Sequence, residues 1–206
     1  QAELHRWLVL LSDIVDVRVR RGGDGHIHWR PYPSLSESHR LALVSAGAGL
    51  RRVTLDEDIL AGRSHRAGSQ SAAGRLQAFE RYVATLAGSE VVVSGPTSAV
   101  LDARMAGIPV IIPAFRDGAT LCDAAHLLRV HTHLKGLWNT NGVFIAETAE
   151  DFVRLVNDFL DNPRRIPPDN SGEHIFVDDR TYAQRLIDVI EDAIAEKDRE
   201  HASATV

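Results

Sequence analysis

Short apolar runs alternate with longer apolar stripes along this chain. Two of the runs, Val91–Val93 and Val110–Ile112, are bounded by turn residues, which is typical of strands that a parallel sheet buries on both faces. Between them, Ser94-Gly95-Pro96-Thr97-Ser98 opens a segment of helical character that ends at Gly107. This order predicts a strand–helix–strand unit whose two strands run parallel.

The same alternation extends over most of the chain. Further strands are predicted over 26–30, 51–55 and 142–146, and further helices over 36–47, 75–87 and 119–135. A last amphipathic helix is marked by Tyr182, Leu186, Val189, Ile190 and Ala193. Strands and helices that alternate with short connections predict an α/β fold with a doubly wound parallel sheet of the Rossmann-like type.

Two other helices carry a clear apolar face. The face of the first is marked by Leu4, Trp7, Leu8, Leu11 and Val15. Because Val15, Val17 and Val19 also alternate, this helix either continues past Val15 or gives way to a strand. Thr148 is predicted to cap the second helix through Asp151. The buried face of that helix is predicted to be Phe152, Leu155, Val156, Phe159 and Leu160.

Length and composition are typical of one generous soluble domain, or of one domain with an appendage. The 206 residues are 44% hydrophobic and 25% charged, which is ordinary for a globular protein. Residues 1–162 are predicted to form the Rossmann-like domain. Residues 163–206 are predicted to be a proline-containing linker and a C-terminal helix that packs on it, with a frayed tail.

Charge and cysteine content limit the cellular compartment and the binding partners that are expected for this chain. The net charge of -5 argues against a general nucleic-acid binder. No apolar run is long enough to span a bilayer, and the first residues lack a signal-peptide pattern. The single cysteine, Cys122, suits a reducing compartment, so a cytoplasmic location is expected.

The start of the predicted helix after Val93 is a candidate anion site. Pro96, Thr97 and Ser98 would lie where free backbone N–H groups and the positive end of the helix dipole favour phosphate. Open α/β sheets bind ligands at this edge. The alternative interpretation is a capping Thr or Ser on a core helix.

Other polar groups carry weaker signals. Asp56, Glu57 and Asp58 follow a strand end, where they serve either a site or a solvated loop. His126, His131 and His133 lack a carboxylate or cysteine at ligand spacing, so no metal site is predicted.

Residues 60–74 are small and polar with no period, which predicts a mobile loop. A loop of this length inside a compact domain is often a lid or a binding loop. Arg63, His65 and Arg66 would then close over an anionic ligand, and a tolerated surface insertion is the other interpretation.

The block from Val92 to Pro113 resembles the C-terminal domain of GT-B glycosyltransferases of the capsule and teichoic-acid type. It has the Thr97-Ser98 pair, the acidic Asp102 four positions on, and a Gly-x-Pro-Val-Ile start to the next strand. Arg30-Pro31-Tyr32-Pro33 stands where that family has Arg-Pro-His-Pro. The similarity in element order spans roughly residues 5–195.

The resemblance implies a role for each matching residue. Thr97 and Ser98, with Gly95 in the same turn, would bind the diphosphate of an activated nucleotide donor, and Arg30 would face the phosphates. Asp102 would hold the ribose hydroxyls, since a carboxylate accepts from two neighbouring hydroxyls. Tyr32 replaces the family's histidine, and the resemblance identifies no catalytic residue in this chain.

The expected function is therefore the donor-nucleotide-binding half of a glycosyltransferase, or of a related glycerophosphotransferase, that builds surface polysaccharide. The acceptor domain and the opening strand of the sheet are expected to lie outside this chain, so the isolated half is expected to be inactive. No metal or other cofactor is implied. The implied location is cytoplasmic, with peripheral attachment to the inner membrane face left open. A nucleotide-sugar epimerase and a non-catalytic Rossmann-like module that binds a nucleotide or a protein are the alternatives.

Overall fold

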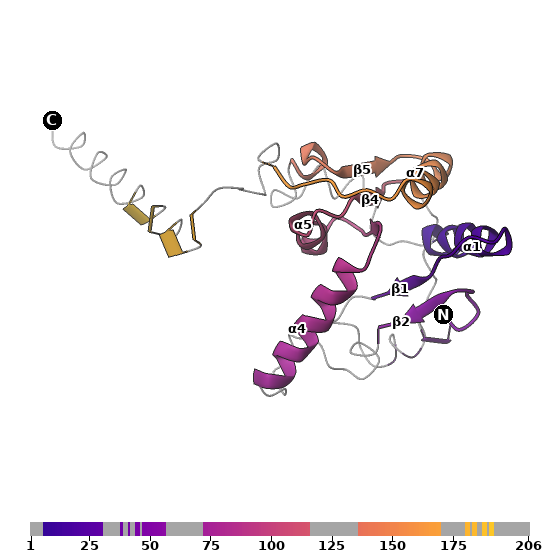
Figure 1. The fold of residues 1–206 in the computed structure, drawn as a ribbon, viewed down its shortest axis with the longest axis horizontal. Helices are drawn as coiled ribbons and strands as arrows, with labels where there is room; N and C mark the ends of the chain where they lie inside the picture. Colours follow the sequence, from indigo (N-terminus) through magenta and orange to yellow (C-terminus); the bar gives the residue numbers. More distant parts are fainter. Residues whose placement is uncertain are drawn as a thin grey trace. The chain divides into compact units, whose positions relative to one another are not determined.

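The structure is a computed structural model, and it describes residues 6–30, 38, 41, 44–45, 47–56, 72–115, 136–169, 180–181, 183–184, 187–188 and 190–191. The chain consists of two compact units, Gln1–Ile175 and Phe176–Val206. The elements discussed below all belong to the first unit (Figure 1). The boundary expected after residue 162 stays a prediction.

Helices and parallel strands alternate in this unit, so the predicted α/β class is confirmed. The strands are β1 (Ile27–Trp29), β2 (Val53–Leu55), β3 (Val92–Val93), β4 (Val110–Pro113) and β5 (Val143–Ala146). The helices are α1 (Arg6–Arg20), α4 (Ala72–Ala87), α5 (Ser98–Met105), the 3-10 helix η2 (Leu137–Asn139) and α7 (Ala149–Asp161).

The described strands form two parallel sheets. β1 pairs with β2 in one sheet, and the other has the order β3-β4-β5. Val92 stands opposite Val110, and Val110 stands opposite Val143, so the predicted parallel unit β3–α5–β4 is confirmed. The doubly wound single sheet goes beyond what these pairings show.

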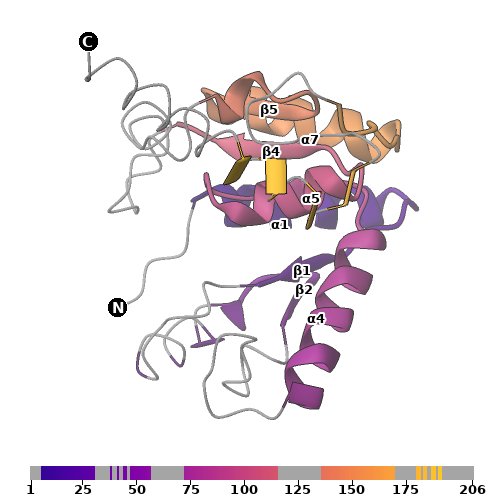
Figure 2. The ribbon, with the colours of Figure 1, turned by 90° about the vertical axis from the view of Figure 1, so that its left-hand side faces the viewer.

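Each face of the three-stranded sheet has its own core. Ile111 of β4 faces a core built with α1, α7 and the strand β1, while its neighbours Val110 and Ile112 face α5. All four residues of β4 are buried, as its unbroken apolar run predicts for a central parallel strand. β3 differs, because its two valines are only half-buried. Figure 2 shows α1 and α7 with this sheet from a second side.

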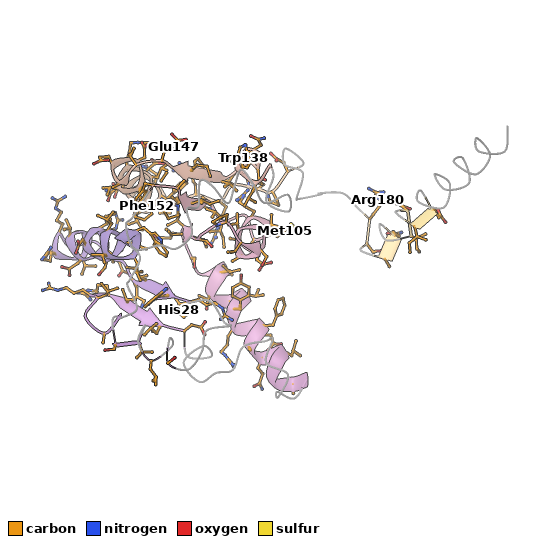
Figure 3. The ribbon with its side chains drawn as sticks, turned by 180° about the vertical axis from the view of Figure 1, so that it is seen from behind. His28, Met105, Trp138, Glu147, Phe152 and Arg180 are labelled. Carbon is orange, nitrogen blue, oxygen red and sulfur yellow. The ribbon has the colours of Figure 1, made fainter. Side chains whose placement is uncertain are left out.

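The first and last helices of the unit follow from their apolar spacing. α1 continues to Arg20, so the strand alternative for Val15–Val19 is wrong; Val15 and Val19, four positions apart, both pack into the core with α7. At α7 the Thr148 hydroxyl accepts a hydrogen bond from the N–H of Asp151 at 3.0 Å, and the cap is confirmed. All five residues of its predicted apolar face are buried, among them Phe152 (Figure 3).

A buried arginine holds α5 in place. Arg104 is fully buried and donates to the carbonyl oxygens of Asn141, Ile108 and Ile166 at 2.7–2.8 Å. Burial lowers the pKa of its guanidinium, and the carboxylate of Asp169 acts in the opposite direction. The charge is thus balanced mainly by carbonyl dipoles, and these bonds join α5 to the loop before β5 and to the segment after α7.

Candidate functional site

Polar side chains lie directly after three of the described parallel strands. Arg30 directly follows β1, Asp56 directly follows β2, and Ser94 directly follows β3 and opens the turn into α5. The carboxyl ends of parallel strands are the usual ligand-binding edge of an α/β sheet. The contacts among these residues and with α4 define the candidate site.

Asp56 is the fixed centre of the first part of the site. Its side chain is buried, and one carboxylate oxygen accepts from Arg30 Nη1 and lies 3.3 Å from His28 Nε2. Its backbone N–H donates to the carbonyl of Trp29, so the strand pairing sets its position. The solvated-loop interpretation is therefore wrong for Asp56, while Glu57 and Asp58 lie outside the described residues.

Tyr82 of α4 joins this cluster to α5. The guanidinium of Arg30 lies over the Tyr82 ring, 4.9 Å from its centroid, which is the geometry of a cation–π contact. The Tyr82 hydroxyl donates to the carboxylate of Asp102 at 2.9 Å. Burial, followed by the nearby Asp102 carboxylate, raises the pKa of this phenol, and Arg30 opposes the shift. Arg30 and Asp102, both expected at the site, are thus linked through a residue that sequence reasoning missed.

Among the described residues, one nitrogen of Arg30 has no hydrogen-bond partner. Arg30 Nη2 is buried and makes no hydrogen bond, although Nη1 of the same side chain is bound to Asp56. A buried donor that is left unpaired costs about 1–3 kcal/mol, and more when the group is charged. A bound anion that accepted from Nη2 would remove this cost.

The beginning of α5 is open to a ligand. Thr97 occupies the N-cap position in extended conformation, yet its side chain makes no capping hydrogen bond; its hydroxyl lies 3.4 Å from that of Ser94. The first N–H groups of a helix have no intrahelical partner, so those of Ser98 and Ala99 are available. A Cβ built on Gly95 meets no atom within 4 Å, which leaves room beside the turn.

Thr97 thus holds the N-cap position of α5 without making a capping hydrogen bond, and the anion site stays a prediction. Ser98 and Asp102 are four positions apart on α5, so their side chains share one face of the helix. Arg63, His65 and Arg66, the expected lid, lie outside the described residues, as do Tyr32 and the three histidines at 126, 131 and 133. Within the described ranges, no group of three metal-ligating side chains is found.

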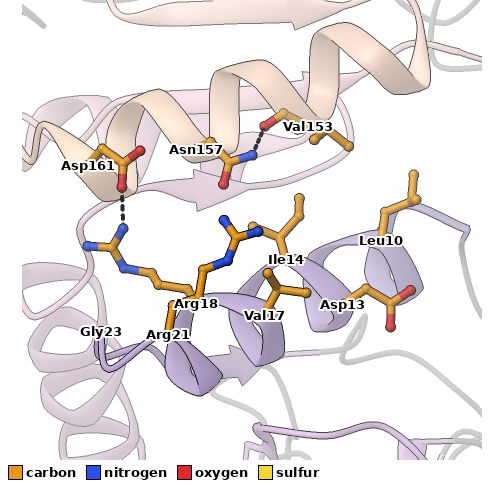
Figure 4. Close-up of a pocket in the computed structure, with 10 residues that line it drawn as sticks. All are labelled: Leu10, Asp13, Ile14, Val17, Arg18, Arg21, Gly23, Val153, Asn157 and Asp161. Carbon is orange, nitrogen blue, oxygen red and sulfur yellow. Dashed lines mark hydrogen bonds and ion pairs between the residues drawn. The ribbon is translucent and has the colours of Figure 1, made fainter.

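A hollow lies between α1 and α7, on the sheet face opposite α5 (Figure 4). Its volume is about 580 Å³, and Leu10, Ile14, Val17 and Val153 give it an apolar wall. One end is bounded by the ion pair between Arg18 and Asp161. It contains none of the residues of the candidate site.

Comparison of the chain with protein-family models, with curated proteins and with solved structures finds no match. In the part of the chain that the structure describes, no helix is both long and apolar enough to cross a membrane.

Proposed function

We propose that this chain binds a nucleoside diphosphate, as the donor half of a GT-B type glycosyltransferase or glycerophosphotransferase. One observation carries the proposal: among the described residues, the buried Nη2 of Arg30 has no hydrogen-bond partner, and the guanidinium lies over Tyr82, whose hydroxyl donates to Asp102 of α5. The N-cap residue of that helix, Thr97, makes no capping bond. A guanidinium and helix N–H groups are the donors that proteins most often present to phosphate. In this proposal the two parallel sheets are parts of one doubly wound sheet.

Each residue would contribute a distinct interaction. Asp56 holds the guanidinium of Arg30 through Nη1, so Nη2 is oriented before the ligand arrives. Thr97, Ser98 and the first N–H groups of α5 would bind the second phosphate from the helix side. The Asp102 carboxylate has accepting capacity beyond its bond from Tyr82 and would take a ribose hydroxyl.

In a transfer reaction these groups would act electrostatically. Negative charge develops on the departing nucleoside diphosphate, and preorganised N–H donors lower the energy of that charge without reorganising. Asp56 is neutralised by Arg30 and therefore does not leave an uncompensated negative charge beside the phosphates. The carboxylate, guanidinium and N–H groups are enough for binding, and the proposal includes no metal.

Calorimetric titration with UDP, CDP and GDP tests the proposed binding. Arg30→Lys keeps a cation for Asp56 but lacks the second donor, so binding should weaken roughly 10-fold or more. The double variant Thr97→Ala, Ser98→Ala should lose about 1–3 kcal/mol of binding free energy. Arg154→Gln removes an exposed arginine of α7 and should bind like the parent chain. No binding at millimolar nucleotide, or equal binding by all variants, contradicts the proposal.

Transfer activity separates the catalytic proposal from a module that only binds. The acceptor side of a GT-B cleft is expected on another domain, so the chain alone should bind nucleotide without transferring sugar. Supplying an acceptor domain of this fold, fused or as a separate chain, should start turnover. Sugar transfer by residues 1–206 alone would contradict the half-enzyme proposal but leave the binding site intact.

A further inference from the structure

Tyr82 contacts two polar groups that the proposed nucleotide site takes from different elements. The guanidinium carbon of Arg30, which follows β1, lies 4.9 Å from the centroid of the Tyr82 ring. At the far end of the same side chain, the hydroxyl donates to the carboxylate of Asp102 in α5 at 2.9 Å. One side chain of α4 therefore touches both the residue proposed to bind phosphate and the residue proposed to bind ribose.

The packing of α4 determines where Tyr82 lies. Ala78, one turn earlier on the same side of the helix, is 1% exposed, whereas Phe79 is 54% exposed. Figures 1 and 2 both show α4 beside β1 and β2. A tyrosine side chain has only two torsion angles, so a contact at the ring and another at the hydroxyl leave it little freedom. Tyr82 is thus a rigid link between the two polar groups.

The hydroxyl of Tyr82 acts on Asp102 as a donor. Burial, followed by the Asp102 carboxylate, raises the pKa of the phenol, so it keeps its proton at neutral and mildly alkaline pH. A carboxylate offers about four acceptor positions, and the bond from Tyr82 occupies one of them. This bond also limits rotation of the carboxylate, so its remaining acceptor positions keep a set direction.

The ring of Tyr82 acts on Arg30 in a different way. A cation over an aromatic face is attracted by the ring quadrupole, and the attraction grows when the site is desolvated. The Arg30 side chain is 18% exposed, and its Nη1 donates to Asp56. Asp56 thus holds one edge of the guanidinium while Tyr82 supports one face, so that both the position and the plane of the cation are restrained.

We propose that Tyr82 is a positioning residue that sets the specificity of the site for ribonucleoside diphosphates. This inference rests on the proposed function, and it assigns separate tasks to the two ends of one side chain. The ring orients Arg30 toward the phosphates, and the hydroxyl orients Asp102 toward the ribose hydroxyls. A site built to bind a ligand hydroxyl rejects the analogue that lacks it, because its polar group then loses a partner. Tyr82 favours ribose in this way by acting through Asp102.

Calorimetric titration of three variants separates the two tasks. The probes are inorganic pyrophosphate, the nucleoside diphosphate that binds best among UDP, CDP and GDP, and its analogue without the ribose hydroxyls. Tyr82→Phe keeps the ring, so its affinity for pyrophosphate should stay within about twofold of that of the parent chain. Its preference for the ribose form over the analogue should fall at least about threefold, because the bond to Asp102 is lost.

Tyr82→Leu loses both contacts, so its affinity for pyrophosphate should also fall, by about threefold or more. Phe79→Leu makes a comparable change on the exposed side of α4 and should bind all three probes like the parent chain. The comparison of Tyr82→Phe with the parent chain decides the question by itself if Tyr82→Leu does not fold.

A double variant tests whether the hydroxyl acts through Asp102. In an Asp102→Ala background, Tyr82→Phe should change the ribose preference no further, because the carboxylate that the hydroxyl orients is gone. An equal change in both backgrounds overturns the inference, as does a Tyr82→Phe variant that keeps the ribose preference of the parent chain. Equal weakening of pyrophosphate and nucleotide binding in Tyr82→Phe would show a purely structural role and also overturns it. No binding of any probe by the parent chain contradicts the proposed function, and the inference then fails with it.

Discussion

At the scale of single residues, the guanidinium of Arg104 fills the space directly beside Gly142. Gly142 has φ +77°, and a Cβ there would lie 2.7 Å from Arg104 Nε. The Arg104 side chain cannot move aside, because its nitrogens donate hydrogen bonds to the carbonyl oxygens of Asn141, Ile108 and Ile166. Gly142 is thus required both for its backbone conformation and for space.

Gly142→Ala and Gly22→Ala separate these two requirements. Gly22 has φ +86° but nothing within 4 Å of an added Cβ, so its substitution should cost about 1–2 kcal/mol through the backbone alone. Gly142→Ala should cost roughly 1–3 kcal/mol more, as overpacking of a tight site does. Urea unfolding measures both. In an Arg104→Met background the extra cost of Gly142→Ala should shrink, and an unchanged difference would contradict the steric explanation.

The phenol of Tyr82 should make stability depend on alkaline pH. Its pKa is raised in the folded protein, chiefly by burial, so the folded state holds this proton more tightly than the unfolded chain does. The resulting stabilisation is complete below the unfolded pKa of about 10 and is lost as the pH rises through the folded value. The stability difference between the parent chain and Tyr82→Phe should therefore fall above about pH 10. Unfolding curves from pH 8 to 11 that stay parallel would contradict this.

Local periodicity explains which residues could be predicted from the sequence. The buried face of α7 was predictable because its five apolar residues repeat within a single helix. Arg30 and Asp102 are expected at the site through the family resemblance. Tyr82 was missed, because its partner is 20 residues away; its only signal is that it lies four positions after the buried Ala78. The carbonyl partners of Arg104 lie up to 63 residues away, and no sequence pattern marks them.

At the scale of elements, the two threonine N-caps contrast in function. Both Thr148 and Thr97 precede a helix in extended conformation. Thr148 accepts a bond from the first turn of α7, whereas Thr97 makes no such bond in α5. The sequence predicts the cap at Thr148, whereas at Thr97 the cap is one of two interpretations, beside the anion site.

Thr148→Ala should therefore affect stability, whereas Thr97→Ala should affect ligand binding. Loss of the Thr148 cap should lower the free energy of unfolding by about 1 kcal/mol. Thr97→Ala should change stability by less than about 0.5 kcal/mol, because no capping bond is lost. Its effect should instead be weaker nucleoside diphosphate binding, which Thr148→Ala should leave unchanged. A large stability loss in Thr97→Ala would show that its hydroxyl is structural.

The length of α1 shows where local pattern stops being informative. Val15, Val17 and Val19 fit a strand as well as a helix when read alone. In the structure these residues are helical, because α1 packs along α7 and its last turn carries Arg18, which pairs with Asp161. That partner lies 143 residues away, so tertiary packing decided a choice that the local sequence left open.

At the scale of the whole molecule, the segment after α7 belongs to the core of the first unit. The N–H of Ile166 donates to Gly107 at 2.9 Å, and its carbonyl accepts from Arg104. Arg165 donates to the carbonyl of Ala87 at the end of α4. The sequence predicts that this segment is a linker because of its prolines. Its contacts connect it to α4 and α5, the two helices that carry Tyr82 and Asp102.

Two truncations locate the end of the folded unit. A chain that ends at Ile175 keeps all these contacts and should unfold in one cooperative transition. A chain that ends at Asn162, the boundary expected from the sequence, leaves the Arg104 guanidinium without its Ile166 acceptor and uncovers part of the core. The loss of a hydrogen bond to a buried charged group costs about 1.5–3 kcal/mol, so the shorter chain should be less stable by at least that amount. Chemical unfolding followed by circular dichroism compares the two chains, and equal midpoints would support a boundary after residue 162.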